Sequence, residues 1–188
     1  MRVLTALCWV GAIALLGYWF WFTADGANAQ AILSRRLDEL IDGRSPGAST
    51  HLARSEANTS GLVGRIEMER PRLSAIIVEG TTPGRLRRGV GHVENSPLPG
   101  ESGNVVLAAH RDTYFSRLGD VHEGDRVTVT TADGVFRYRV AATLVVKPTR
   151  TDLIAPTASD RLTLVTCYPF HWIGPAPDRF IVQAVPER

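Results

Sequence analysis

The sequence predicts an all-β domain over residues 61–188, preceded by an apolar N-terminal helix and a partly helical connection. From residue 62 onward, short apolar runs alternate with turn residues about every ten positions, a pattern typical of a β-barrel or a β-sandwich. No run after residue 61 is long and periodic enough for more than a one- or two-turn helix, and residues 116–121 are the best candidate. The chain of 188 residues suffices for one domain with a short extension.

The N-terminal segment is predicted to anchor the chain in a membrane. Residues 3–22 carry no charge, and as a helix they would span about 30 Å, the thickness of the hydrocarbon core. Aromatic residues crowd the end of this run, as in an interfacial belt. The alternative is a cleaved signal peptide with an Ala-x-Ala site at residues 27–29, but the apolar run is longer than the usual 7–15 or so residues, which favours an uncleaved anchor over residues 1–22. Arg2 before the run and Asp25 after it favour a cytoplasmic tip, Met1-Arg2, and an extracytoplasmic domain.

Residues 23–60 are predicted to form a partly helical stalk. Apolar residues recur at helical spacing between residues 29 and 42, and Gly43 ends this pattern. Residues 45–50 have the composition of a linker, and residues 51–60 are polar without periodicity. The helical part either holds the domain away from the bilayer or packs on it, and both arrangements remain open.

The clearest local prediction within the domain is a β-hairpin. Residues 126–131 alternate between apolar and polar side chains, and Asp133-Gly134 is the pair preferred for a two-residue type I′ turn. In the return strand, Phe136, Tyr138 and Val140 are expected to point inward. Other strands are predicted at residues 61–67, 75–78, 104–109, 142–146, 161–166 and 180–184. The connections are expected to be a turn at residues 81–84, an irregular segment at 89–100 and a polar loop at 149–159.

Three reactive or charged side chains are predicted to lie at strand ends. Cys167 follows the strand at residues 161–166, because Tyr168-Pro169 cannot continue a central ladder. His110 ends one predicted strand, and Arg179 opens another. Acyl transfer needs such a set: a nucleophile, a proton donor for the leaving amine, and a positive group where the oxyanion develops.

The thiol has no intrachain disulfide partner on its own side of a membrane. The second cysteine, Cys8, lies within the apolar N-terminal segment, where a small lipid-facing residue is the simpler interpretation. A leftover thiol in an exported domain indicates reactivity, although a single buried cysteine is more often a small hydrophobic residue.

These residues lie in segments that resemble the three motifs of the sortase family. The sequence LTLVTC, ending at Cys167, resembles the TLxTC signature. The sequence AHRDTYF, which contains His110, resembles the histidine motif, and APDRF, which contains Arg179, resembles the arginine motif. The finer match, over CYPF and APDRF, is with class D sortases, and the resemblance extends from about residue 62 to the C-terminus. A GxGH stretch ending at His92 is similar to a framework segment of the family, so a structural role is predicted for His92.

The resemblance implies an eight-stranded sortase-type β-barrel with one or two short helices and the activity of a membrane-anchored cysteine transpeptidase. Cys167 would attack an LPXTG-type sorting signal after its threonine and form a thioester. His110 would protonate the departing amine and deprotonate the incoming one, while Arg179 would stabilise the oxyanion. The implied partners are sorting-signal proteins, an amine acceptor on peptidoglycan or a pilin, and the cell membrane, crossed once by the N-terminal helix. No cofactor is implied.

Residues near the three motifs are weaker candidates for the site. Thr166 and Tyr168 flank the thiol, and Trp172 lies in the aromatic loop that follows, so these three are candidate substrate-binding residues; packing into the barrel explains the aromatic residues nearly as well. Asp112 could orient the imidazole of His110, although residues two positions apart on a bent loop often point apart.

Composition and spacing argue against other classes. The net charge of +2 is too small for a nucleic-acid-binding protein, and the basic residues 85–88 are interpreted as a solvated face. His122 and His171 lack metal-ligand spacing, so no metal site is predicted. An L,D-transpeptidase has its cysteine after a His-Gly pair, whereas Val165-Thr166 precedes the thiol here. A catalytically silent β-domain that binds a partner is the remaining alternative.

Overall fold

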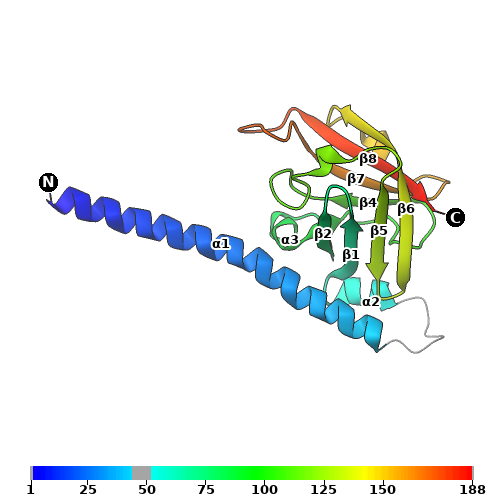
Figure 1. Cartoon of the computed structure of the whole chain (residues 1–188), viewed down its shortest axis with the longest axis horizontal. Helices are drawn as coiled ribbons and strands as arrows, with labels where there is room; N and C mark the ends of the chain where they lie inside the picture. Colours follow the sequence, from blue (N-terminus) through cyan, green and yellow to red (C-terminus); the bar gives the residue numbers. More distant parts are fainter. Residues whose placement is uncertain (1, 44–51, 188) are drawn as a thin grey trace.

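The all-β prediction is confirmed by a computed structural model, which describes residues 2–43 and 52–187 of the chain. Eight strands close into a barrel in the order β1-β2-β3-β4-β7-β8-β6-β5 (Figure 1). The strands are β1 (Leu62–Met68), β2 (Leu73–Glu79), β3 (Val90–His92), β4 (Asn104–Ala108), β5 (Arg126–Thr131), β6 (Gly134–Val146), β7 (Arg161–Tyr168) and β8 (Asp178–Pro186). The helices are α1 (Arg2–Asp42), α2 (Leu52–Thr59), α3 (Pro83–Arg88) and two 3-10 turns, η1 (Leu118–Asp120) and η2 (Thr151–Ile154).

The interior of the barrel is filled by alternate residues of its strands. On β7, Leu162 and Leu164 are fully buried in the core, as are Val105 and Leu107 on β4 and Val182 on β8. Because side chains alternate across a strand, the residues between these positions face the outer surface. This alternation decides which side of the barrel each candidate site residue occupies.

The N-terminal helix α1 is continuous from Arg2 to Asp42, and its apolar half projects away from the barrel (Figure 1). It is long and apolar enough to cross a membrane, and its large apolar side chains between Leu7 and Trp19 are exposed. The predicted linker at residues 45–50 lies outside the described residues. The following polar stretch, which lacks helical periodicity, contains the short helix α2.

The C-terminal half of α1 packs on the outer face of β1 and β2. Leu37 is 1% exposed and contacts a second apolar cluster made of Leu62, Ile76 and Val78. Arg65 of β1 donates hydrogen bonds to Ser34 at 2.6 Å and to Asp38 at 2.9 Å. The amphipathic part of the predicted stalk therefore packs against the domain, which is one of the two arrangements that the sequence leaves open.

The hairpin at residues 126–140 forms, with its turn one residue earlier than predicted. Thr131 pairs with Gly134, so Ala132 and Asp133 make the two-residue loop. The Thr131 hydroxyl accepts a hydrogen bond from the backbone N–H of Asp133 at 3.1 Å, a local Ser/Thr turn that competes with the Asp-Gly preference. The return strand continues through a register shift near Ala142, so the strand predicted at 142–146 is part of β6.

Three connections contain regular structure where the sequence predicts turns, loops or irregular segments, and one of them is the polar loop at 149–159, which contains η2. Residues 83–88 form α3, a helix with proline in its first turn and no buried residue, so the solvated face predicted at 85–88 is confirmed and the turn predicted at 81–84 runs into a helix. The irregular segment predicted at 89–100 contains β3, which pairs in parallel with β2 and antiparallel with β4. The short helix predicted at 116–121 is present as η1.

Candidate active site

The ladder register brings three of the predicted site residues to one level of the barrel. Strands β4 and β7 run parallel, with pairs advancing one for one as far as Ala108 opposite Val165. The same register, extended two residues beyond the end of β4, places His110 opposite Cys167. On the other side of β7, Cys167 pairs directly with Arg179 of the antiparallel strand β8. The imidazole, thiol and guanidinium therefore come from three adjacent chain segments at the same height.

All three side chains belong to the outer face of the barrel. Leu164 is on the inner face of β7, and Cys167 is an odd number of residues away. The same argument applies to Arg179, whose neighbour Phe180 faces inward, and to His110, which follows the inward Ala109. Cys167 as a whole is half-buried.

Cys167 and Arg179 lie within their strands, not at the strand ends that the sequence suggested. The ladder continues one pair beyond them, to Tyr168 opposite Asp178, before Pro169 interrupts it. The backbones that carry the thiol and the guanidinium are therefore held by hydrogen bonds of the sheet. His110 follows β4 by two residues.

The backbone at His110 is held by a buried threonine. Thr166 is 2% exposed, and its hydroxyl donates a hydrogen bond to the carbonyl oxygen of Ala109 at 2.8 Å. The backbone N–H of Phe115 donates to the carbonyl oxygen of His110 at 3.2 Å. Thr166, a candidate for contact with substrate, is thus enclosed beneath the site, where it fixes the chain that leads into His110.

The Arg179 guanidinium binds its own loop. Its Nη1 donates to the carbonyl oxygen of Asp178 at 2.9 Å and to that of Ala176 at 3.4 Å. Asp178 in turn forms an ion pair with Lys147 at 2.7 Å. Within residues 2–43 and 52–187, no hydrogen bond joins the side chains of Arg179, Cys167 and His110 to one another.

The aromatic candidates separate into a packed pair and an exposed residue. The Tyr168 ring stacks on Phe180 with ring centroids 6.2 Å apart and meets Phe170 edge-on at 5.8 Å, and both Tyr168 and Phe170 pack against the barrel core. Trp172 is 49% exposed, with its indole N–H donating to the carbonyl oxygen of Pro175 at 3.0 Å. Of these three rings, Trp172 is the one that presents a large surface to solvent.

Arg111 is a residue near the site whose contribution the sequence analysis missed. Its Nη2 donates to the carbonyl oxygens of Trp172 at 2.8 Å and Gly174 at 3.0 Å, which ties the loop after β4 to the loop between β7 and β8. Its Nη1 is buried without a hydrogen-bond partner among the described residues. The available signal was its position directly after His110, in a motif already singled out.

The remaining histidine and carboxylate candidates lie outside the set of three. His92 is 2% exposed; its Nδ1 is 2.8 Å from a carboxylate oxygen of Glu79, and its Nε2 is 3.0 Å from the carbonyl oxygen of Pro97. These contacts agree with a structural role. Asp112 is exposed and has no hydrogen bond to His110 in the part of the chain that the structure describes.

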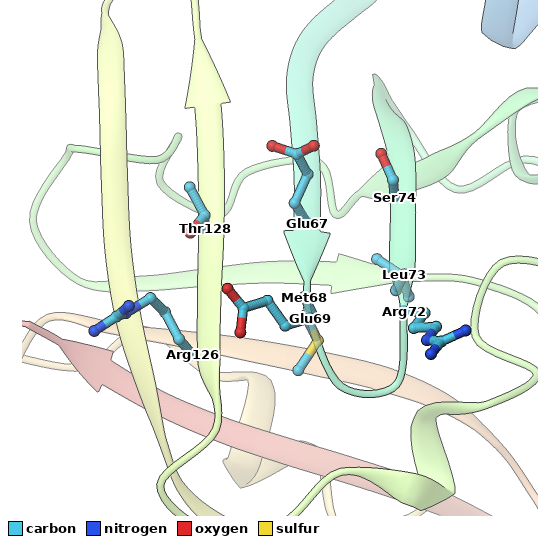
Figure 2. Close-up of a pocket in the computed structure, with 8 residues that line it drawn as sticks. All are labelled: Glu67, Met68, Glu69, Arg72, Leu73, Ser74, Arg126 and Thr128. Atoms are coloured by element: carbon cyan, nitrogen blue, oxygen red, sulfur yellow. The ribbon is translucent and has the colours of Figure 1, made fainter.

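Two hollows bear on the position of the site. A pocket of about 580 Å³ lies between α1, α3 and residues 110–114, and His110 lines it. A second hollow of about 510 Å³ lies on the outer surface of β1, β2 and β5, on the side of the barrel away from β7 and β8. Figure 2 shows its Glu67 and Ser74 on neighbouring strands, with Thr128 across from Glu67 on a third strand. The first pocket is the one that reaches the level of the thiol.

The family model described as Sortase domain matches residues 66–187, which is well over half of the chain. The chain belongs to the sortase family. Sortases are cysteine transpeptidases, and the resemblance noted from the three motifs is confirmed. Sortase D of Bacillus subtilis is 37% identical over 139 residues, a match that covers 71% of this chain and 70% of the relative.

Solved sortase structures share the fold. A sortase D5 transpeptidase of Clostridium perfringens superposes with a TM-score of 0.70 at 24% identity, over 88% of this chain and 99% of that one. Sortase C1 of Streptococcus agalactiae has a TM-score of 0.66 at 28% identity, over 83% of this chain and 86% of that one. The eight-stranded sortase barrel expected from the resemblance is therefore confirmed.

Proposed function

We propose that this sortase uses Cys167 as nucleophile, His110 as general acid and base, and Arg179 as the cation that stabilises the oxyanion. The observation that carries the proposal is the shared register level of the three residues on one face of the barrel. A peptide laid across this face meets sulfur, imidazole and guanidinium in adjacent positions. Catalysis of acyl transfer requires these three roles close together.

The reaction proceeds in two acyl transfers. The Cys167 thiolate attacks the carbonyl carbon of the scissile bond, and Arg179 donates hydrogen bonds to the oxygen that becomes negative. His110 protonates the departing amine, and a thioester remains on sulfur. A second amine then attacks the thioester carbon, His110 takes its proton, and the thiolate leaves.

The proposed substrate is an LPXTG-type sorting signal, cut after its threonine. Sortases act on sorting-signal proteins and pilins, which supports a peptide donor of this kind and an acceptor amine on peptidoglycan or a pilin. Trp172 is the candidate for contact with the apolar part of the peptide, because it is exposed and lies in the loop that joins the cysteine and arginine strands.

The proposed topology is a single-pass anchor over residues 1–22, a stalk over 23–60 and an extracytoplasmic catalytic domain over 61–188. The exposed apolar half of α1 supports the anchor, and sortases are membrane-associated. The charge order around the apolar run supports a cytoplasmic N-terminus.

The test is mass spectrometry of the full chain in detergent after incubation with a panel of LPXTG-type peptides. The expected result is an acyl adduct on Cys167 that disappears in Cys167→Ala. The matched control is Cys8→Ala, because Cys8 is exposed on α1 and lies outside the proposed site. An adduct that persists in Cys167→Ala, or no adduct with any peptide of the panel, would overturn the proposal.

A further inference from the structure

We infer that the pocket beside His110 binds the amine that accepts the acyl group, and that α1 supplies one wall of this acceptor pocket. The inference rests on the proposed function and adds a site to it. The pocket of about 580 Å³ is lined on one side by residues of the N-terminal helix, including Gly26 and Ala27, and on the other by His110 and Asp112. In Figure 1, α1 passes directly beside α3, where this wall is formed.

The helical wall is fixed to the barrel by specific contacts. The backbone of α1 approaches α3 so closely at Gly26 that a Cβ there would lie 2.8 Å from the carbonyl oxygen of Arg87. The side-chain amide of Gln30 donates to the carbonyl oxygen of Arg88. From the barrel side, the Tyr114 hydroxyl donates to the same Arg87 carbonyl at 3.0 Å. These contacts hold the wall of the pocket in place without a ligand.

The order of the strands decides which reactant enters this pocket. Helix α3 packs on β2 and β3, whereas Cys167 and Arg179 lie on β7 and β8, beyond β4. The acceptor pocket, His110, Cys167 and Arg179 therefore follow one another around the barrel. Arg179 binds the carbonyl oxygen of the acyl group on one side of Cys167. The attacking amine therefore has to approach from the other side, where the base His110 lies. That side is the acceptor pocket.

The transfer step balances with the groups that are present. The neutral amine attacks the thioester carbon, a C–N bond forms and the C–S bond breaks. The proton lost by the nitrogen passes to the His110 imidazole, and the electron pair of the broken bond leaves on the sulfur of Cys167 as a thiolate. No oxidant, metal or further reactant is needed.

The charges that line the acceptor pocket favour an amine that carries an oxygen-bearing group. Free amines are protonated near neutral pH, and the exposed carboxylate of Asp112 attracts the ammonium form. The bound ammonium releases one proton to solvent water before the neutral amine attacks, and the second proton then passes to His110. Arg87 also lines the pocket, and its positive charge favours an acceptor that carries a carboxylate or carbonyl oxygen over a plain alkylamine. The chemical class of acceptor is therefore an amino acid or peptide amine, and simple alkylamines fit less well.

The experiment compares acyl transfer with hydrolysis in the full chain in detergent micelles. An LPXTG-type peptide is the donor and glycylglycine the acceptor, and the ratio of amide to acid product is measured by mass spectrometry. In Ala27→Trp the indole occupies the acceptor pocket, and the ratio with glycylglycine falls about tenfold, whereas the smaller hydroxylamine is less affected. The matched control is Ala31→Trp, which is exposed on the same helix and does not line the acceptor pocket.

A second variant, Asp112→Asn, tests the charge of the pocket without adding bulk. It raises the glycylglycine concentration needed for half-maximal transfer about threefold and weakens the dependence on salt. Ethylamine is expected to be a poorer acceptor than glycylglycine in the wild type. If the ratio of amide to acid product falls in Ala27→Trp and Asp112→Asn behaves as the wild type, the pocket is supported and the role of Asp112 is overturned. Wild-type ratios in both variants, with the Cys167 adduct present in the wild type, overturn the inference while the proposed function stands; absence of that adduct overturns the proposed function itself.

Discussion

At the scale of single residues, the proposed site includes Cys167 and Arg179, whose backbones pair with each other. Cys167 and Arg179 are direct partners in the β7–β8 ladder, so their Cα atoms are held together whatever the side chains are. A substitution of Arg179 should therefore alter the chemistry and leave the strand pairing in place. The chemical contribution of the guanidinium is separable from the fold.

Arg179→Lys tests that contribution. A lysine keeps the charge but loses the planar guanidinium, whose several N–H donors can bind more than one substrate oxygen at once. Thioester formation is therefore expected to slow about 10²-fold or more. Rapid-quench mass spectrometry of the Cys167 adduct measures the rate. Arg137→Lys, an exposed change on β6, is the matched control. A rate within about twofold of the wild type would remove Arg179 from the mechanism.

Tyr138 gives the chain a pH dependence at the alkaline end. Burial raises the pKa of Tyr138 to about 12, with a smaller contribution from Asp160 and an opposing hydrogen bond from the backbone of Gly100. The unfolded chain ionises this phenol near pH 10, so the stability it contributes is complete below about pH 10 and is lost as the pH rises toward 12. The total is on the order of 2–3 kcal/mol at most.

Tyr138→Phe is therefore expected to lose less stability than the wild type between about pH 10 and 12, a window set by the unfolded and folded pKa values of the phenol. Urea unfolding at several pH values measures the free energies, and tyrosinate absorbance should show one fewer late-titrating phenol in the variant than in the wild type, since burial also raises the pKa of Tyr114. Parallel loss of stability in the two proteins would contradict the assignment.

At the scale of elements, the loop between β7 and β8 is positioned by a contact from outside it. Arg111 binds two carbonyl oxygens of that loop, at Trp172 and Gly174. The loop carries the exposed Trp172, and its C-terminal end leads directly into Arg179. A shift of this loop would move the proposed peptide contact and the cation together.

Arg111→Met removes both hydrogen bonds and retains much of the side-chain length. The expected effect is about a tenfold fall in kcat/KM for an LPXTG-type peptide, because misplacement of positioning groups by about an ångström is costly. Increased mobility of Trp172, measured by fluorescence anisotropy, should accompany the fall. Arg117→Met, exposed on the neighbouring segment, serves as control. Unchanged anisotropy with reduced activity would assign Arg111 a role other than loop positioning.

The strands could be predicted more completely than their arrangement. The runs around Cys167, His110 and Arg179 have clear β patterns, and the motif resemblance singled out the three candidate side chains without any pairing information. Their common level could not be predicted from spacing, because the register between β4 and β7 joins segments more than fifty residues apart in sequence. The exact ends of β7 and β8 depend on the same pairing, since each strand extends beyond its apolar run.

At the scale of the whole molecule, the N-terminal helix α1 and the barrel are joined by packing as well as by the chain itself. The amphipathic pattern of residues 29–42 indicated that α1 has a partner, but an apolar stripe does not identify the surface it covers. The outer faces of β1 and β2 supply that surface through Leu62, Ile76 and Val78. On these two strands, some apolar residues face the interior of the barrel and others face α1, and the strand pattern alone did not distinguish the two groups.

Leu37→Ala tests this docking. Removal of a fully buried leucine costs about 2–4 kcal/mol, and here the cost is expected to fall on the contact between α1 and the barrel. The backbone N–H of Ile76, which donates to Gln30 at 2.9 Å, should exchange its hydrogen faster. The control is Ile32→Ala, because Ile32 is 66% exposed on the same helix. Equal exchange at Ile76 in wild type and Leu37→Ala would show that the contact is not needed to hold α1.

The unbroken course of α1 has a geometric consequence. In an α-helix each residue adds about 1.5 Å of length and about 100° of rotation. One residue inserted between the exposed apolar half and the docked half would rotate the barrel by roughly a quarter turn about the helix axis. Seven inserted residues, close to two full turns, would move the barrel by about 10 Å along the axis and return it nearly to its original orientation. In the proposed membrane topology, the number of residues in this helix therefore sets the direction in which the thiol faces in the plane of the bilayer.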